Sequence, residues 1–258
     1  MVENKVVIIT GSARGIGFEI GKYFAQAGAK VVLSDINEEG VKASADELNA
    51  QGFTSIGIKA DVTNEDDLIN LVATTKETFG SVDVLINNAG LQHVSPIEDF
   101  PTAKFELMQK IMLTAPFILM KHVFPIMKEQ GFGRVINIAS INGVIGFAGK
   151  AAYNSAKHGV IGLTKVAALE GAEHGITVNA IAPGYVDTPL VRGQMADLAA
   201  TRNVDIEDVL DEVLYPLIPQ KRLLDVSEVA HAALFLASEQ AKGMTGQTMI
   251  IDGGYTAQ

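Results

Sequence analysis

The sequence contains no cysteine, which excludes disulfides, thiolate catalysis and metal sites held through sulfur. It also lacks an excess of positive charge. The net charge is −10 and the pI about 5.0, so a nucleic-acid partner or an anionic membrane surface is disfavoured. The five histidines show no metal-ligand spacing. We therefore expect no metal site and no nucleic-acid partner.

The chain also lacks long apolar runs. None approaches the ~18 residues that a membrane-spanning helix needs. The first five residues do not begin a secretory signal, because no basic segment is followed by an apolar one. With 48% hydrophobic and 19% charged residues, the chain can nevertheless bury a substantial core. These features predict a soluble protein of the cytoplasm that does not associate with a membrane.

What is present is an alternation of apolar runs and helical patterns. Residues 5–10 form a short run rich in β-branched residues, typical of a strand buried on both faces. A glycine-rich turn at 11–17 follows, then a helical pattern over 18–27 and a second strand over 30–35. This order predicts a β-α-β unit with parallel strands.

The same alternation continues to the end of the chain and predicts a single α/β domain over 1–258, with helices on both faces of an open parallel sheet. The irregular stretch 185–224 is the natural place for a mobile cover over a site. We expect helices over about 38–51 and 64–79, strands over about 54–60, 82–86, 134–139 and 177–182, a long helical region over about 101–130 that is kinked or broken near Pro116 and Pro125, and a last helix capped by Ser227 before a strand from Thr248.

The glycine-rich turn has the spacing Gly11-x-x-x-Gly15-x-Gly17. Glycines between a strand and its helix let the backbone approach a pyrophosphate at the helix N-terminus. Asp35 ends the second strand, where a carboxylate can accept hydrogen bonds from the adenosine ribose and repel a 2′-phosphate. This carboxylate therefore favours NAD over NADP. Arg14 weakly favours NADP, since a cation in the glycine-rich turn can contact phosphate. The sequence predicts NAD as the cofactor.

A second group of residues is suited to proton transfer. Tyr153 and Lys157 lie one helical turn apart, and an ammonium beside a phenol favours the phenolate and lowers the phenol's pKa. Ser140, at the end of an apolar run, can donate a hydrogen bond to a substrate carbonyl. Together these residues predict reduction of a ketone or oxidation of an alcohol.

Seven motifs in this order resemble the short-chain dehydrogenase/reductase family over nearly the whole chain. The resemblance implies a Rossmann-type doubly wound sheet of about seven parallel strands, and a homotetramer whose contacts involve the long helices after strands four and five. The matching residues are Thr10-Gly-Ser-Ala-Arg-Gly-Ile-Gly17, Asp61-Val62, Asn87-Asn-Ala-Gly90, Ser140, Tyr153-x-x-x-Lys157, Pro183-Gly184 and Asp252-Gly-Gly254.

The resemblance also implies roles for individual residues. Tyr153 would be the general base in oxidation and the acid in reduction, Ser140 would polarise the carbonyl, and Lys157 would bind the nicotinamide ribose. Asp61 and Val62 would lie near the adenine. The full set of implied cofactor contacts is Gly11, Arg14, Gly15, Ile16, Gly17, Asp35, Asp61, Val62, Asn88, Ala89, Gly90, Tyr153, Lys157, Pro183, Val186 and Thr188.

One position departs from the family pattern. The family usually has an asparagine in the helix after strand four, which supports a water between the active-site lysine and solvent. Met112 stands there and cannot donate a hydrogen bond. We expect the proton to leave by another route, through Thr114 or backbone carbonyls; the alternative is impaired turnover.

Within the family the chain most closely resembles the D-3-hydroxybutyrate dehydrogenases, over residues 91–101, 131–140 and 183–190. That resemblance implies that Gln92, Lys150 and Gln194 bind the substrate carboxylate. The implied substrate contacts also include Ser140, Tyr153 and Tyr185. Tyr185 stands where the resemblance leads us to expect a tryptophan. His93 is expected to pack, or to support the site from behind the residues that touch the substrate, and not to catalyse.

Two alternatives remain open from the sequence. The enzyme could reduce another small carbonyl compound, such as acetoin, diacetyl or a 3-oxoacyl thioester. It could also be a dinucleotide-binding protein without catalysis, a reading motivated by Met112.

Overall fold

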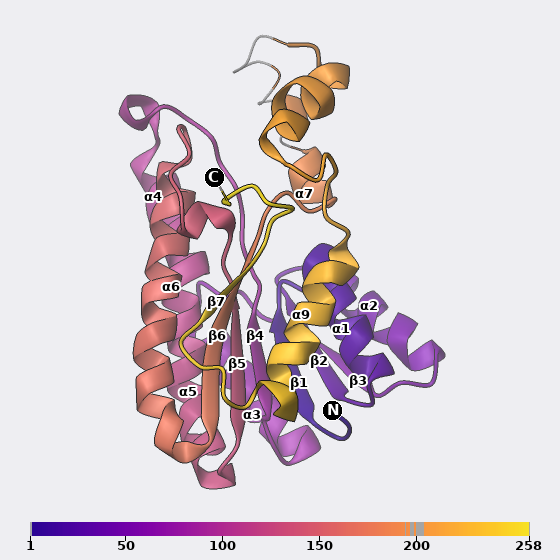
Figure 1. Ribbon diagram of the computed structural model, residues 1–258. Helices are drawn as coiled ribbons and strands as arrows, with labels where there is room; N and C mark the ends of the chain where they lie inside the picture. The colour runs from indigo at the N-terminus through magenta and orange to yellow at the C-terminus, as the bar shows by residue number, and fades with distance from the viewer. Residues whose placement is uncertain (1, 194, 197–198, 200–203, 258) are drawn as a thin grey trace.

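The computed structural model describes residues 2–193, 195–196, 199 and 204–257. Its centre is a parallel sheet of seven strands in the order β3-β2-β1-β4-β5-β6-β7 (Figure 1). Short runs rich in β-branched residues form these strands because both faces of the sheet are covered, and their charged residues lie at or next to the strand ends. The strands are β1 Val6–Thr10, β2 Lys30–Asp35, β3 Ser55–Lys59, β4 Val84–Asn87, β5 Gly133–Ile138, β6 Ile176–Pro183 and β7 Thr248–Ile251.

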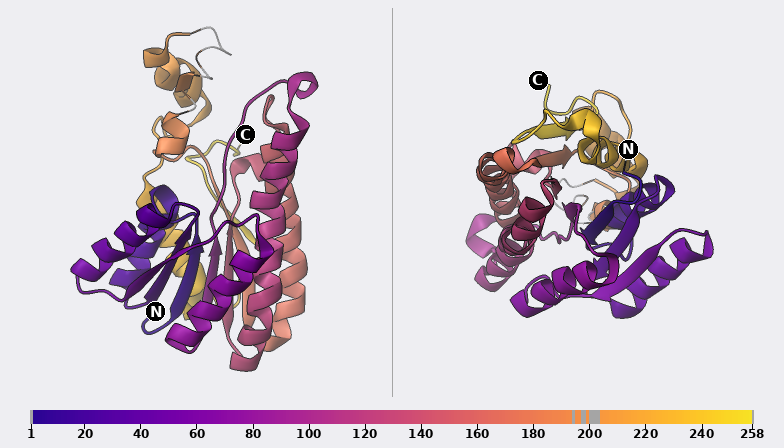
Figure 2. Two further views of the ribbon diagram at one scale, coloured as in Figure 1. Left: turned by 180° about the vertical axis from the view of Figure 1, so that it is seen from behind. Right: turned by 90° about the horizontal axis from the view of Figure 1, so that it is seen from below.

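Helices cover both faces of the sheet, as the sequence predicts (Figure 2). Successive strand residues point to opposite faces. Ile9 and Leu33 therefore belong to the core under one set of helices, while Ile8 and Val32 belong to the core under the other. The first set is α1 Gly15–Gln26, α2 Glu38–Ala50 and α9 Val226–Ala237; the second is α3 Glu65–Phe79, α5 Ala115–Gln130 and α6 Ala151–Gly171.

The region 101–130 differs from the expectation of a break at its prolines. Helix α4 (Thr102–Gln109) runs through a π-helical turn, Lys110–Thr114, directly into α5. Pro116, which has no N–H to donate, comes just after the π-helical turn, and the wider turn accommodates it without a break in the helix. By length and composition alone, Thr102–Gln130 could cross a membrane. Its apolar residues instead pack against α3, α6 and the sheet.

The stretch after β6 is tied together at its two ends. Val186 and Leu224 form an isolated parallel bridge, with hydrogen bonds from Asp187 N to Leu224 O (2.9 Å) and from Leu224 N to Tyr185 O (2.8 Å). Asp225, and not Ser227, caps α9, because its carboxylate accepts the first free N–H groups while Glu228 completes a capping box. The described helical pieces between the ends are α7 Pro189–Arg192 and the short turns Ile206–Asp208, Val209–Leu214 and Tyr215–Leu217.

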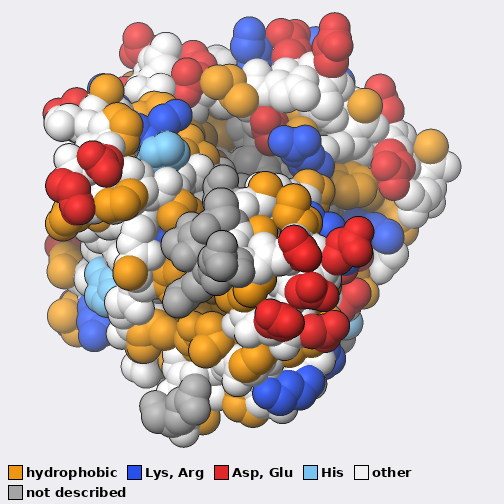
Figure 3. All heavy atoms as spheres, turned by 90° about the horizontal axis from the view of Figure 1, so that it is seen from above, with side chains coloured by type: hydrophobic (Ala, Val, Ile, Leu, Met, Phe, Trp, Pro, Cys, Tyr) orange, Lys and Arg blue, Asp and Glu red, His pale blue; other side chains and the backbone are white. Residues whose placement is uncertain are grey.

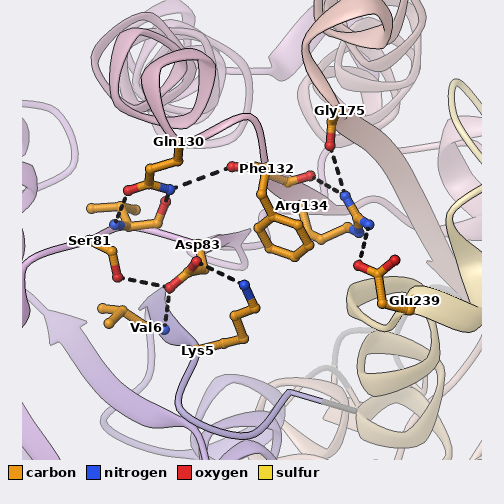
Figure 4. A network of polar contacts seen from close by, with 11 residues as sticks. Lys5, Val6, Ser81, Asp83, Gln130, Phe132, Arg134, Gly175 and Glu239 are labelled. Atoms are coloured by element: carbon orange, nitrogen blue, oxygen red, sulfur yellow. Dashed lines mark hydrogen bonds and ion pairs between the residues drawn. The ribbon is translucent and has the colours of Figure 1, made fainter.

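A polar network joins the amino ends of β1, β4 and β5, at the edge of the sheet away from the cavity described below (Figure 4). Asp83 accepts a hydrogen bond from Lys5 (3.3 Å), and the buried Arg134 pairs with Glu239 (3.1 Å). Both cations make cation–π contacts with the ring of Phe132, with Lys5 Nζ 3.7 Å and Arg134 Cζ 4.3 Å from its centroid. The network therefore fastens the start of three strands.

Candidate active site

A cavity of about 940 Å³ lies at the carboxyl ends of the strands. Its wall takes residues from the segments after β1, β2, β3, β4, β5 and β6. The strand order reverses between β1 and β4, which is where open α/β sheets place their ligand sites. Figure 3 shows this face from above, with a hollow and a group of acidic side chains to one side.

The glycine-rich turn has the shape that a phosphate cradle requires. A Cβ on Gly11 would lie 2.8 Å from Ala89 Cα, and one on Gly17 would lie 2.5 Å from Gly11 O. Gly15 has a φ of +62° and no atom within 4 Å of where a Cβ would be, so its backbone faces open space. The turn ends at α1, whose N-terminal N–H groups favour an anion.

Asp35 lies where the sequence places it, at the end of β2 and in the cavity wall. Its two carboxylate oxygens accept hydrogen bonds from Ala13 N (3.1 Å) and Asn37 N (3.0 Å). These bonds fix the carboxylate beside the glycine-rich turn. Ile36, which is exposed and also in the wall, was missed by the sequence reasoning; its position directly after Asp35 was the available signal.

Asn88 anchors the segment after β4 to the glycine-rich turn. Its Nδ2 donates to Thr10 O (2.9 Å) and Gly11 O (2.8 Å), while Thr10 Oγ1 accepts from the backbone N–H groups of Asn88 and Ala89 (3.1 Å each). Thr10 is a supporting residue that the spacing of the glycines did not reveal. The remaining expected cofactor contacts, Arg14, Ile16, Asp61, Val62, Gly90, Pro183, Val186 and Thr188, also line the cavity.

Ser140, Tyr153 and Lys157 meet in the cavity wall. Ser140 follows β5, and Tyr153 and Lys157 lie one turn apart near the start of α6, as predicted. Lys157 Nζ donates to Ile138 O (2.6 Å) and lies 5.5 Å from the centroid of the Tyr153 ring. Ser140 Oγ accepts from Asn142 N (3.2 Å), which leaves its proton to point toward another acceptor.

The electrostatics differ from the expectation that Lys157 lowers the pKa of Tyr153. Burial raises the pKa of Tyr153, and a hydrogen bond with Ser140 opposes this with a smaller effect. Burial also lowers the pKa of Lys157 from 10.5 to about 8. The physical reason is that both groups lose water together, so each disfavours its own charged form. The ammonium must offset this burial for the phenol to act as a base near neutral pH.

The comparisons with known proteins agree with this geometry. The family model described as "Enoyl-(Acyl carrier protein) reductase" matches residues 11–256. The chain belongs to the short-chain dehydrogenase/reductase family. As such it is an oxidoreductase, and the cradle, Asp35 and Asn88 fit the nicotinamide dinucleotide that the family implies.

Relatives cover the whole chain. The uncharacterized oxidoreductase YxjF of Bacillus subtilis (strain 168) is 60% identical over 100% of both chains. The D-beta-hydroxybutyrate dehydrogenase of Rhizobium meliloti (strain 1021) is 42% identical over 98% of this chain and 99% of its own. The crystal structure of an actinorhodin polyketide ketoreductase with NADPH superposes with a TM-score of 0.95 at 33% identity, covering 99% and 98% of the two chains.

The residues expected to bind substrate are only partly brought together. Gln92 lines the cavity, and its Oε1 accepts from His93 N (3.2 Å), so its amide N–H groups face other acceptors. Lys150 is 3% exposed and lies between the rings of Phe147 (4.5 Å) and Tyr185 (5.8 Å). The described cavity-lining residues include neither Lys150 nor Tyr185. Gln194 lies outside the described residues.

Burial lowers the pKa of Lys150 from 10.5 to about 8, because the ammonium loses its water. Within the part of the chain that the structure describes, no carboxylate compensates for this charge. A buried cation without a counter-charge is costly, and a partner from outside the chain would stabilise it.

Met112, the departure from the family pattern, lies in the π-helical turn and is 1% exposed. It packs with Met108, Ala152 and Ala156, and a Cβ on Gly90 would lie 3.5 Å from its sulfur. The wall between this helix and the active site is therefore apolar at this point. The described residues show no cluster of side chains that could hold a metal ion.

Proposed function

We propose that the protein is an NAD-dependent dehydrogenase that interconverts (R)-3-hydroxybutyrate and acetoacetate. The observation that carries this proposal is the uncompensated ammonium of Lys150, buried beside the wall that holds Tyr153. A small keto acid supplies the missing negative charge, and charge-assisted hydrogen bonds are the strong ones. The relative from Rhizobium meliloti is named for this activity and supports the proposal.

The choice of NAD rests on Asp35. Its carboxylate is held by two backbone N–H groups beside the cradle, where it suits ribose hydroxyls and repels a 2′-phosphate. Arg14 is exposed in the same wall and is the residue that would favour NADP. A carboxylate fixed in place outweighs an exposed arginine, which can move away into water.

The proposed roles of the catalytic residues follow from their positions. When bound, a nicotinamide dinucleotide accepts or supplies the hydride. Tyr153 takes the proton of the substrate hydroxyl in oxidation and returns it in reduction, at its phenolic oxygen. Ser140 donates a hydrogen bond to the substrate oxygen, and Lys157 holds its charge close to the phenol.

A 3-oxoacyl thioester is the rival substrate, and the negative charge of the segment 185–224 disfavours it. The cover segment carries five exposed acidic residues, which repel the phosphates of a pantetheine carrier. A free acid with a single carboxylate is repelled less than a carrier that bears several phosphates. These acidic residues are Asp205, Glu207, Asp208, Asp211 and Glu212.

We also propose a homotetramer. Helices α5 and α6 pack on the sheet but also carry large hydrophobic residues that are exposed. These are Phe117 on α5 and Val166 and Leu169 on α6. Ile250 is similarly exposed on β7, which forms one edge of the sheet. Such residues support burial against further copies of the chain, and sedimentation of the purified protein tests this.

The deciding experiment measures NADH formation with (R)- and (S)-3-hydroxybutyrate in parallel, with NADP as a cofactor control and diacetyl reduction as a substrate control. Fast turnover of the (R) acid with NAD is expected. If the protein binds NADH but forms none from either acid, the hydroxybutyrate assignment is refuted. Turnover of diacetyl alone moves the function to neutral carbonyl compounds. Binding of NADH without turnover of any carbonyl leaves the non-catalytic reading.

A further inference from the structure

His93 lies in the wall of the cavity. This residue lines the wall with Gln92, Leu107 and Ile111, in the same cavity as Tyr153. Lys150, by contrast, is closed off between two aromatic rings. On the loop after Gly90, the polar side chains that line the cavity are therefore the imidazole and the amide of Gln92.

The imidazole is held in a fixed orientation by its ring contacts. The centroids of His93 and Phe100 are 5.2 Å apart at an interplanar angle of 88°, and Phe100 packs in the same manner on Phe105 at 6.3 Å. Such edge-to-face contacts orient a ring without using its nitrogen atoms. Over the ranges that the structure describes, neither ring nitrogen of His93 has a hydrogen-bond or ion-pair partner.

The loop that carries His93 is also fixed in place. Ser95 N donates to Gly149 O (2.9 Å), which ties this loop to the segment before Tyr153. At its other end, Gln92 Oε1 accepts from His93 N. The imidazole thus stays beside the reacting centre when the loop is free of substrate.

Leu107 and Ile111 make the neighbouring wall apolar, so their side chains offer the imidazole no hydrogen-bond partner. An imidazole has an N–H donor in its neutral form and two in its charged form, so it can bind a carboxylate in either state. Phe147 and Tyr185 flank the buried Lys150, which does not line the cavity, whereas His93 does.

We propose that His93 is a specificity-determining residue whose imidazole binds the carboxylate of keto and hydroxy acids longer than acetoacetate and 3-hydroxybutyrate. This inference rests on the proposed function, since it assigns a second acid-binding group to the same site. It widens the substrate class to longer linear acids.

The test compares reduction of acetoacetate, 5-oxohexanoate and neutral 2-hexanone by NADH. Substituting His93→Leu is expected to lower kcat/KM for 5-oxohexanoate about tenfold to a hundredfold, as for one lost hydrogen bond to a charged group. The values for acetoacetate and 2-hexanone should stay within about twofold. His93→Gln, which keeps a donor, should restore part of the loss.

Phe100→Leu is the matched control, because it disturbs the ring packing and keeps the imidazole. It should leave the preference for 5-oxohexanoate over 2-hexanone largely intact. An equal loss in Phe100→Leu and His93→Leu, or an unchanged preference in His93→Leu, overturns the proposal.

If the wild-type protein reduces no keto acid, the proposed function is refuted. The role of His93 can still be tested by a binding measurement that does not depend on turnover. Hexanoate binding to the protein–NADH complex is then measured by calorimetry. Weaker binding in His93→Leu than in the wild type supports the acid-binding role of the imidazole. Equal binding, or none to the wild type, overturns it.

Discussion

Replacing Lys150 by methionine should stabilise the protein and weaken its substrate binding. The pKa of Lys150 falls from 10.5 to about 8 through burial. At about 1.4 kcal/mol per pKa unit, this difference corresponds to a cost of about 3 kcal/mol in folding. Contacts with the rings of Phe147 and Tyr185 return ~0.5–2 kcal/mol. We therefore expect Lys150→Met to raise the free energy of unfolding by about 1–3 kcal/mol at pH 7.

The gain should depend on pH in one direction. Below pH 8 the lysine is charged in both the folded and the unfolded chain, so folding carries the full cost of burying the ammonium. Between about 8 and 10.5 the folded form becomes neutral first, the wild type gains stability, and the advantage of the methionine variant shrinks. Urea unfolding at pH 7 and pH 10 measures this difference.

Lys165→Met is the control, because Lys165 is exposed on the same helix. It should change stability by less than about 0.5 kcal/mol at either pH. In parallel, kcat/KM for acetoacetate should fall roughly tenfold to a thousandfold in Lys150→Met, since the buried anchor for the carboxylate is lost. A variant that is no more stable than the wild type at pH 7, or equally stabilised at both pH values, would refute the reasoning from burial.

Four further changes address other parts of the molecule. Tyr153→Phe should lower kcat by ~10² to 10⁴-fold, with NADH affinity by fluorescence unchanged; normal turnover would exclude Tyr153 as the acid–base group. Asp35→Ala should weaken NAD binding about tenfold or more and shift the kinetic preference toward NADP, whereas an unchanged NAD/NADP ratio would contradict the role of the carboxylate. Met112→Asn buries an amide among apolar residues and should cost about 1–3 kcal/mol in urea unfolding without raising kcat; a faster enzyme would show that the methionine limits the proton's exit. Phe132→Leu removes the ring shared by two cations and should cost about 1–4 kcal/mol with NADH binding intact, so a loss of NADH affinity would count against the separation of the two sheet edges.

The strands were predictable because each is a short, mostly apolar run in a sheet that helices cover on both faces. The run at 30–35 coincides with β2, and the other strand ends differ by one or two residues. The cofactor cradle was equally predictable, since its residues follow the ends of strands that the fold must bring to one edge. Asp35 and Asn88 accordingly lie in the same cavity wall.

Other features depend on packing that periodicity does not contain. Pro116 signalled an irregularity, but only the surrounding helices decide that the chain passes through a π-helical turn and does not break. The direction in which the pKa of Tyr153 shifts depends on how much water reaches the phenol, and the spacing of residues in the sequence does not reveal this. His93 was expected to pack or to support the site from behind other residues, yet it both packs on Phe100 and itself lines the cavity.

The bridge between Val186 and Leu224 has an evolutionary consequence. Because the two ends of the intervening stretch are bonded to each other, its length is nearly independent of the sheet. Doubling the length of such a closed loop costs only about 0.6 kcal/mol in chain entropy. Insertions, deletions or whole replacements between these two residues can therefore diversify what the site accepts, while the hydride-transfer machinery on β5 and α6 is inherited unchanged.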